Sequence, residues 1–291
     1  MTTPRLRLPP WLRFTVPTGP AYRATSAELR RAGVATVCEE ARCPNVADCW
    51  SRRAATVMIL GDTCTRGCRF CSVKTARAPA PPDPAEPARV AELAVRLQWR
   101  HVVLTSVDRD DLPDAGAAHY AETVRRVRQA LPLATVEVLI PDFGGAPERV
   151  QQVLQAGPHV LGHNLETVRR LTPHVRDARA SYDRSLGVLA LAHGFAPRPV
   201  VKSALLLGLG ETRDEVSEAL RDLRAAGCEA LAVGQYLQPG RDQLAVARYV
   251  LPDEFDAIGA EARDLGFTSV ASAPRVRSSY HADGSPAPTI G

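Results

Sequence analysis

Short apolar runs rich in β-branched residues alternate along most of the chain with longer stretches in which apolar residues recur every three or four positions. This alternation is typical of parallel strands joined by crossover helices. The apolar runs predict six strands, at residues 56–60, 101–105, 135–140, 159–162, 200–207 and 230–233, and a short seventh at 268–271. The amphipathic stretches predict helices at residues 87–98, 115–131, 147–155, 165–171 with 185–193, 213–225 and 252–265. We therefore expect an α/β fold, a partial (β/α)6 TIM-type barrel.

Two further segments flank the predicted barrel, which spans residues 56–272. Residues 1–55 form an N-terminal extension, and residues 273–291 form a C-terminal tail whose small, polar end we expect to be disordered. No apolar run approaches the length of a membrane span, and the basic start of the chain lacks the apolar centre of a secretory signal. We expect a soluble, cytoplasmic protein with no membrane partner.

Composition adds little to this picture. The 291 residues are 45% hydrophobic and 23% charged, which is enough to bury a core without disulfides. The net charge of +4 is scattered, and only Lys74 and Lys202 are lysines among the 36 basic residues. This preference for arginine is typical of a GC-rich genome, and scattered charge forms no basic face, so we expect no nucleic-acid partner. Lys202 interrupts an apolar strand and should either point into a pocket or snorkel to solvent.

The cysteines are the informative residues. Of the seven, six fall into two triplets, Cys38-x4-Cys43-x5-Cys49 and Cys64-x3-Cys68-x2-Cys71. In a reducing compartment such clusters are metal ligands or redox groups more often than disulfides. Structural zinc usually needs four ligands, whereas three thiolates on a 4Fe-4S cube leave one iron open to a small molecule. Cys228, alone before an apolar strand, is expected to be a small buried hydrophobe.

The second triplet, in Cys64-Thr65-Arg66-Gly67-Cys68-Arg69-Phe70-Cys71, resembles the radical S-adenosylmethionine superfamily. The resemblance implies that the open iron chelates the amino and carboxylate groups of S-adenosylmethionine, which is then split to a 5′-deoxyadenosyl radical. Polar or glycine-rich segments also follow each predicted strand, where barrel enzymes build their active sites. These segments are the Cys64 loop, 105–111, 141–145, 163–166, 208–212 and 234–236. We expect them to share one pocket.

Other segments make the resemblance specific to one family. Cys38-Glu39-Glu40-Ala41-Arg42-Cys43-Pro44-Asn45 with Cys49, and Arg277-Ser278-Ser279-Tyr280-His281-Ala282, resemble lipoyl synthase. The similarity extends over about residues 8–283 and includes Trp11-Leu12-Arg13, Pro17-Thr18-Gly19 and Gly234-Gln235-Tyr236-Leu237-Gln238-Pro239.

The resemblance assigns roles to individual residues. Cys64, Cys68 and Cys71 would hold the 4Fe-4S cube that cleaves S-adenosylmethionine. Cys38, Cys43 and Cys49 would hold an auxiliary 4Fe-4S cube whose fourth ligand is the Ser279 hydroxyl, a hard donor that leaves a labile corner on a soft cluster. Contacts to S-adenosylmethionine are implied for Ser106, Asn164, Glu166 and Arg184, each of which could equally be an ordinary capping or surface group.

The implied reaction is sulfur insertion. The auxiliary cube would be consumed as two sulfur atoms enter C6 and C8 of an octanoyl chain carried on a lysine of a lipoyl-carrier protein. Implied partners are the lipoyl domains of 2-oxoacid dehydrogenase E2 subunits, the glycine cleavage H protein, a ferredoxin- or flavodoxin-type reductant and a cluster-repair carrier. Three alternatives stay open: a two-cluster electron carrier, a structural zinc protein, and a sulfur-inserting radical enzyme acting on a free small molecule.

Overall fold

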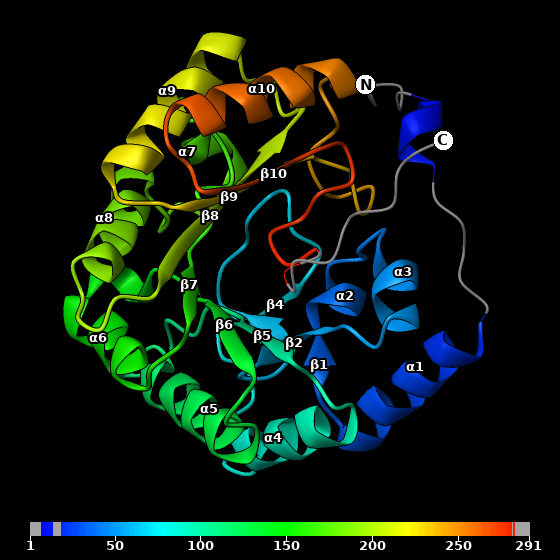
Figure 1. Ribbon diagram of the computed structural model, residues 1–291, viewed down its shortest axis with the longest axis vertical. Coiled ribbons are helices and arrows are strands. Elements are labelled where there is room, and N and C mark those ends of the chain that lie inside the picture. Colours follow the sequence, from blue (N-terminus) through cyan, green and yellow to red (C-terminus); the bar gives the residue numbers. More distant parts are fainter. Residues whose placement is uncertain (1–6, 14–18, 281, 283–291) are drawn as a thin grey trace.

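The computed structural model describes residues 7–13, 19–280 and 282. Its main sheet has eight strands in the order β1-β2-β5-β6-β7-β8-β9-β10. The strands are β1 (Ala35–Thr36), β2 (Thr56–Ile59), β5 (His101–Ser106), β6 (Thr135–Leu139), β7 (Val160–Gly162), β8 (Val200–Leu207), β9 (Ala230–Gln235) and β10 (Ser269–Ser272). Neighbouring strands pair in parallel, except that β1 pairs antiparallel with β2. Since β1 and β10 end the order, the sheet curls into a barrel that stays open on one side (Figure 1).

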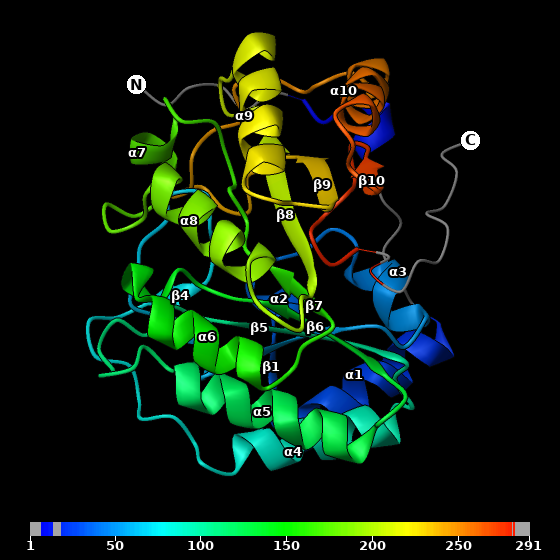
Figure 2. The same cartoon turned by 60° about the vertical axis from the view of Figure 1, so that its left-hand side comes forward.

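Helices cover the outer face of the curled sheet (Figures 1 and 2). In chain order they are α4 (Glu86–Arg96), α5 (Ala117–Ala130), α6 (Pro147–Gln155), α7 (Thr172–Val175), α8 (Tyr182–His193), α9 (Arg213–Ala225) and α10 (Pro252–Asp264). Local sequence sets where several of them begin. Thr212 caps α9 in a reciprocal capping box with Glu215, and proline opens α6 and α10, where its missing N–H costs nothing. The partial (β/α)6 barrel is confirmed.

One predicted helix, over residues 165–171, is wrong. Glu166 has a left-handed backbone (φ 70°), and its N–H and C=O bond to Ala204 and Leu206 of β8. These sheet-like bonds hold the chain extended against β8, so the connection after β7 becomes helical only at α7 and again at α8. Residues 165–171 have a helical pattern of apolar positions, but pairing with a strand about forty residues downstream keeps them from forming a helix.

The N-terminal extension contains elements that the hydrophobic pattern did not indicate. These are the 3-10 helix η1 (Pro10–Leu12), α1 (Pro20–Ala32), α2 (Val37–Glu40), α3 (Val46–Ser51) and the strand β1. Tyr22 on α1 stacks on Trp50 of α3 at 5.3 Å between ring centroids, and Thr25 donates to the Trp50 carbonyl at 2.8 Å. The extension thereby packs beside β2 at the open side of the barrel (Figure 1). Two short strands, β3 (Thr63–Cys64) and β4 (Lys74–Thr75), bracket the second cysteine triplet.

The C-terminal tail runs back into the barrel interior. Val276 packs with Ala204 and Ala232 from the inner face of the sheet. Its carbonyl oxygen approaches Gly234 so closely that no larger residue would fit at that position. Asn45 donates to the Arg275 carbonyl at 2.7 Å and so joins the tail to the first cysteine triplet. The predicted disorder of the last residues falls outside the described residues, as does His281.

Lys202 also faces inward, where its ammonium lies 2.7 Å from the buried Glu137 carboxylate. Glu137 additionally contacts His101 at 2.9 Å, so the charge is neutralised within the protein instead of reaching solvent. Over the described ranges, no helix combines the length and apolar character needed to cross a bilayer.

Candidate functional site

The carboxyl ends of the strands enclose a cavity of about 640 Å³, which we call the first cavity. It is lined by the second cysteine triplet and by residues after most strands, among them Cys64, Cys68, Cys71, Ser106, Asp108, Asp142, His163, Asn164, Glu166, Arg176 and Tyr236. The segment 208–212 is an exception to the predicted shared pocket. Its Glu211 carboxylate turns back to accept from the Gly208 and Leu209 N–H groups, at 2.6 and 2.9 Å.

The cysteine loop presents three free thiols to this cavity. The Arg66 N–H points at Cys64 Sγ (3.4 Å), and the Asp177 N–H points at Cys68 Sγ (3.3 Å). Burial raises the pKa of Cys64 to about 11 and that of Cys68 to about 12. Burial therefore disfavours the thiolate form that a metal needs, whereas the backbone N–H groups aimed at sulfur favour it. The N–H groups thus suit these thiols to ligation.

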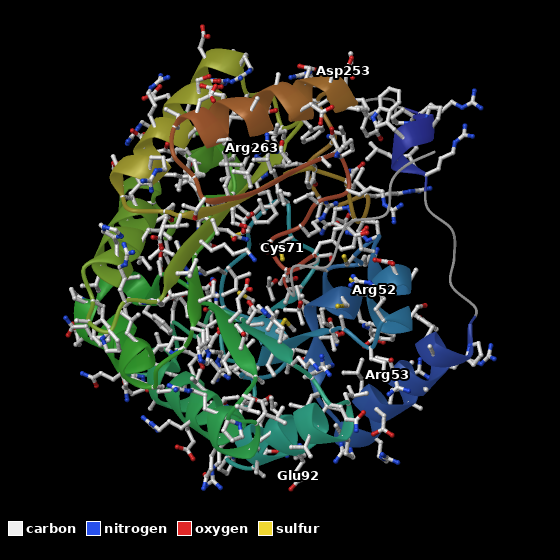
Figure 3. The ribbon with its side chains drawn as sticks, in the orientation of Figure 1. Arg52, Arg53, Cys71, Glu92, Asp253 and Arg263 are labelled. Carbon is white, nitrogen blue, oxygen red and sulfur yellow. The ribbon has the colours of Figure 1, made fainter. Side chains whose placement is uncertain are left out.

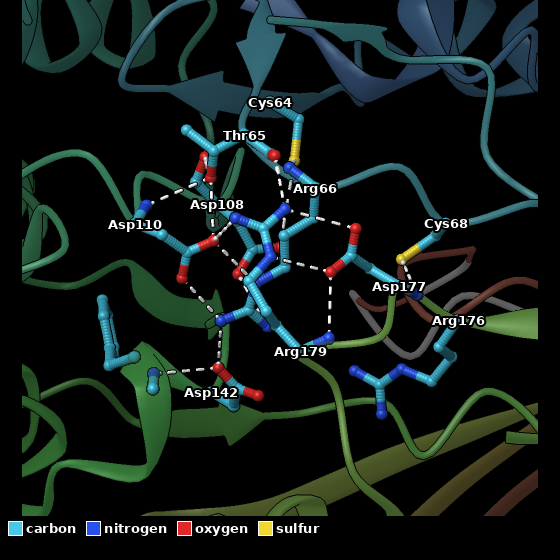
Figure 4. A network of polar contacts seen from close by, with 12 residues as sticks. Cys64, Thr65, Arg66, Cys68, Asp108, Asp110, Asp142, Arg176, Asp177 and Arg179 are labelled. Atoms are coloured by element: carbon cyan, nitrogen blue, oxygen red, sulfur yellow. Dashed lines mark hydrogen bonds and ion pairs between the residues drawn. The ribbon is translucent and has the colours of Figure 1, made fainter. Parts of the chain in front are cut away.

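Arg66, between the first two cysteines of the loop, is the centre of an ion-pair network (Figure 4). Its side chain is only 3% exposed and binds Asp110 through two hydrogen bonds (2.9 and 2.8 Å), Asp142 at 2.7 Å and Asp108 at 3.3 Å. Burial by itself would raise the pKa of Asp142, but the Arg66 guanidinium holds it below its usual range. The network ties the cysteine loop to the loops after β5 and β6.

A second layer of the network involves Arg179 and Asp177. Arg179 pairs with Asp177 at 2.8 Å and with Asp110 at 3.2 Å, and Asp177 accepts the Gly67 N–H at 2.8 Å (Figure 4). Both ends of the loop segment 64–68 are thus held from outside by charged groups. These roles were not predicted from the sequence, although an arginine inside the cysteine motif and three aspartates after one strand were visible signals.

Three of the four residues expected to contact S-adenosylmethionine line the first cavity: Ser106, Asn164 and Glu166. The Ser106 hydroxyl is buried and has no hydrogen-bond partner among the described residues, and Asn164 donates to the Glu166 carboxylate at 3.1 Å. Burial raises the pKa of Glu166. Arg184 does not line the cavity, because its guanidinium is directed to Asp142 (3.5 Å) and to the Arg179 carbonyl (2.5 Å).

The first cysteine triplet lies at a second cavity of about 320 Å³. Cys38 on α2, Cys43 in the following turn, Cys49 on α3 and Ser279 of the tail all line it. The Thr56 hydroxyl at the start of β2 donates to Ser279 Oγ at 2.8 Å. Burial raises the pKa of Cys38 to about 11 and that of Cys49 to about 12.

The two cavities adjoin. Cys43, Ser279, Arg277 and Thr56 line both of them. Within the described part of the chain, no three His, Cys, Asp or Glu side chains converge on a point where a single metal ion could sit. A 4Fe-4S cube instead takes one ligand at each of several separate irons. Each cavity is lined by a full triplet of soft thiols, a set of ligands that fits such a cube. The folded C-terminal tail brings Ser279 to the second cavity, where its hydroxyl adds an oxygen donor.

Comparison with known proteins decides the family. The radical SAM superfamily profile matches residues 58–223, and the profile for the N-terminal domain of lipoyl synthase matches residues 1–43. The lipoyl synthase of Thermus thermophilus is 53% identical over 275 residues, covering 94% of this chain and 85% of that protein. The chain belongs to the lipoyl synthase family. A mitochondrial lipoyl synthase of Branchiostoma floridae is 50% identical over 283 residues, covering 96% of this chain and 75% of that protein.

The prediction of a lipoyl synthase, a radical SAM sulfurtransferase, is therefore confirmed, and with it the use of S-adenosylmethionine and a 4Fe-4S cluster. Among solved structures, the [FeFe]-hydrogenase maturase HydG has a TM-score of 0.57 at 15% identity, covering 74% of this chain and 49% of that one. At this identity the likeness concerns the fold alone, and it agrees with the partial barrel.

Proposed function

We propose that the two cavities hold the two clusters of a lipoyl synthase. Cys64, Cys68 and Cys71 would ligate the S-adenosylmethionine-cleaving cluster at the first cavity. Cys38, Cys43 and Cys49, with Ser279, would ligate an auxiliary 4Fe-4S cluster at the second. The observation that carries this proposal is the shared wall: Cys43 and Ser279 line both cavities, so a chain entering the first cavity reaches the auxiliary ligands without leaving the protein.

When bound, the first cluster with S-adenosylmethionine would supply hydrogen-atom abstraction, and the auxiliary cluster would supply sulfide. Side-chain acids and bases cannot activate an unactivated methylene group, so this chemistry must come from the cofactors. The protein's own residues position them. The N–H groups of Arg66 and Asp177 stabilise charge on two ligating sulfurs, and the Arg66 network keeps the loop in place. Ser106, Asn164 and Glu166 would orient S-adenosylmethionine, the unpartnered Ser106 hydroxyl gaining its hydrogen bond in the complex.

Thr56 would orient the oxygen ligand of the auxiliary cluster. Its hydroxyl donates to Ser279 Oγ at 2.8 Å, which occupies one lone pair of that oxygen and leaves the other free for iron. Because oxygen is a hard donor on a soft cluster, this corner would be the first to open. A cluster that opens readily at one corner suits a sulfur donor that is dismantled during the reaction.

The substrate of this chain would be an octanoyl group in amide linkage to a lysine of a lipoyl-carrier protein, with the lipoyl domains of 2-oxoacid dehydrogenase E2 subunits and the glycine cleavage H protein as carriers. A ferredoxin- or flavodoxin-type protein would supply electrons, and a separate carrier would rebuild the auxiliary cluster. We propose a cytoplasmic location, since seven free thiols suit a reducing compartment.

Anaerobic reconstitution tests the proposal. The loaded protein should contain about eight irons and about eight sulfides per chain, the content of two cubes. With S-adenosylmethionine, a reductant and an octanoyl-lysyl peptide, it should form 5′-deoxyadenosine and a peptide heavier by two sulfur atoms. A protein that holds zinc without iron, or that forms no 5′-deoxyadenosine, would contradict the enzyme assignment. Mass gain on a free small molecule, with none on the peptide, would instead contradict the carrier substrate.

A further inference from the structure

The indole N–H of Trp50 is a buried donor without an acceptor. The side chain is 1% exposed, and within the described part of the chain its Nε1 is buried and has no hydrogen-bond partner. An indole nitrogen can only donate, and when it is buried it usually finds an acceptor, because a lost hydrogen bond destabilises the fold. Trp50 therefore indicates an acceptor that the protein chain alone does not complete.

The backbone brings Trp50 to the first cysteine triplet. Trp50 directly follows Cys49 on α3, and the Cys49 carbonyl accepts the Ala54 N–H at 2.8 Å, which turns the end of this helix toward the start of β2. The antiparallel pairing of β1 with β2 carries the chain from β1 to Cys38 at the same end of β2. The Trp50 donor and the Cys38 sulfur thus belong to one corner of the fold.

The sulfur of Cys38 is the acceptor that this corner offers. Burial raises the pKa of Cys38 to about 11, while the Thr56 backbone N–H and the Trp50 indole N–H oppose that rise. A neutral thiol is a weak acceptor, so the contact becomes a full hydrogen bond when the sulfur carries negative charge, as a cluster ligand does. In Figure 3 Arg52, at the end of α3, lies toward the open side of the barrel, whereas Cys71 lies near its centre. The donor therefore acts at the second cavity.

The indole ring is held in place from α1. Tyr22 stacks on it at 5.3 Å between ring centroids, and Thr25 donates to the Trp50 carbonyl at 2.8 Å. Because the ring is already ordered by these contacts, little conformational entropy is lost when its N–H bonds to a ligating sulfur.

We propose that Trp50 is a positioning residue of the auxiliary cluster: its indole N–H donates to the Cys38 sulfur and raises the reduction potential of the cluster. Hydrogen bonds to ligating sulfurs stabilise the additional negative charge of the reduced state. When a carbon radical forms a bond to a sulfide of the cluster, one electron stays on its irons, so a donor at Cys38 favours sulfur transfer. The inference deepens the proposed function, because it rests on Cys38 ligating an auxiliary cluster.

The test measures the midpoint potential of the auxiliary cluster in the reconstituted full-length protein. Titration with dithionite, followed by electron paramagnetic resonance, adds one electron to each cluster, and S-adenosylmethionine changes the signal of the first cluster only, which identifies the other. Trp50→Phe keeps an aromatic ring against Tyr22 but removes the N–H. The control is Trp99→Phe, because Trp99 also lines the second cavity but its N–H donates to the Arg53 carbonyl instead of a sulfur.

We expect the equilibrium constant for one-electron reduction to fall by about tenfold in Trp50→Phe, the effect of one charge-assisted hydrogen bond, which corresponds to a midpoint about 59 mV lower. Trp99→Phe should leave the midpoint unchanged. If Trp50→Phe does not load the second cluster, replacement of Trp50 by 3-benzothienylalanine decides, since this analogue has the shape of tryptophan and no N–H. A lower midpoint in that protein, or loss of the auxiliary cluster alone, supports the proposal.

A wild-type midpoint in Trp50→Phe, or in the analogue where it decides, overturns the role of Trp50 and leaves the proposed function in place. An equal shift in Trp99→Phe also overturns it, because the effect would then not require a donor to sulfur. Loss of both clusters in the analogue counts against it in the same way, as a general structural effect. A wild type that loads only about four irons overturns the proposed function and this inference together.

Discussion

Replacing Arg66 by glutamine should show how strongly the cysteine loop depends on its buried charge. The change removes the partner of Asp142, which is fully buried, and of Asp110 and Asp108, which are 23% and 24% exposed. Breaking a buried pair by deleting one partner costs about 3–5 kcal/mol. Asp142 still accepts the Gly144 N–H at 2.9 Å and keeps a longer contact to Arg184. Its contribution to the loss of stability should therefore lie at the lower end of this range, at about 3 kcal/mol.

Asp110 and Asp108 together should contribute about 1 kcal/mol or less to this loss, because partly exposed pairs are each worth about 0–1 kcal/mol and Arg179 stays 3.2 Å from Asp110. We therefore expect Arg66→Gln to lower the free energy of unfolding by about 3–4 kcal/mol near pH 7. Anaerobic urea unfolding followed by circular dichroism measures it. The matched control is Arg69→Gln on the same loop. Its guanidinium donates to the exposed His174 carbonyl and to no other described residue, so the change should alter stability by less than about 0.5 kcal/mol.

The pH dependence gives a second check. In the folded protein burial opposes ionisation of Asp142 and Asp110, yet Arg66 holds the pKa of each below its usual value. A carboxyl group with a lowered folded pKa contributes stability that is present above its unfolded pKa and is lost as the pH falls through the folded pKa. The difference between Arg66→Gln and wild type should thus shrink below about pH 4. A loss under 1 kcal/mol at pH 7, or a difference that grows toward low pH, would refute the reasoning.

The remaining predictions concern the two clusters. Ser279→Ala should still form 5′-deoxyadenosine but lose or slow lipoyl formation, because only the auxiliary ligand set changes; full lipoyl yield by mass spectrometry would disprove the ligand assignment. Cys68→Ala should abolish 5′-deoxyadenosine, and its persistence by chromatography would remove this residue from the ligand set. Gly234→Ala would push a methyl group into the Val276 carbonyl and expel the tail, so iron should fall toward about four per chain while S-adenosylmethionine cleavage continues. Gly187→Ala, where a methyl group meets nothing within 4 Å, is the control, and equal iron in both variants would contradict the role of the tail.

Much of the barrel could be predicted because its signals are local. Most of the parallel strands, such as β2 and β9, are buried on both faces and read as apolar runs, and the helices between them keep a solvent-facing stripe. The bounds of α6 and α9 were predicted to the residue, since proline and a capping box mark their starts. Residues 165–171 failed for the opposite reason: the bonds from Glu166 to β8 join residues far apart in sequence, and no local pattern announces them.

The same contrast holds at the site. Spacing alone grouped Cys64, Cys68 and Cys71 on one loop, because three residues so close in sequence cannot lie far apart in space. Spacing could not show which of two arginines on the connection between β7 and β8 reaches the cavity. In the fold Arg176 lines the first cavity, whereas the Arg184 guanidinium is directed to Asp142. That choice depends on partners from several strand ends, which meet only when the barrel closes around them.

By itself, then, the sequence determined which chemical groups follow which strands: two thiol triplets and a polar turn after nearly every strand. It also determined the family to which the chain belongs. Only the tertiary structure decided how these parts meet. Thr56 and Ser279 stand 223 residues apart, yet one hydrogen bond joins them where the tail folds into the open side of the barrel. Contacts of that separation depend on the packing of the whole sheet, since the chain entropy lost in closing so long a loop is repaid only by the core that the fold buries.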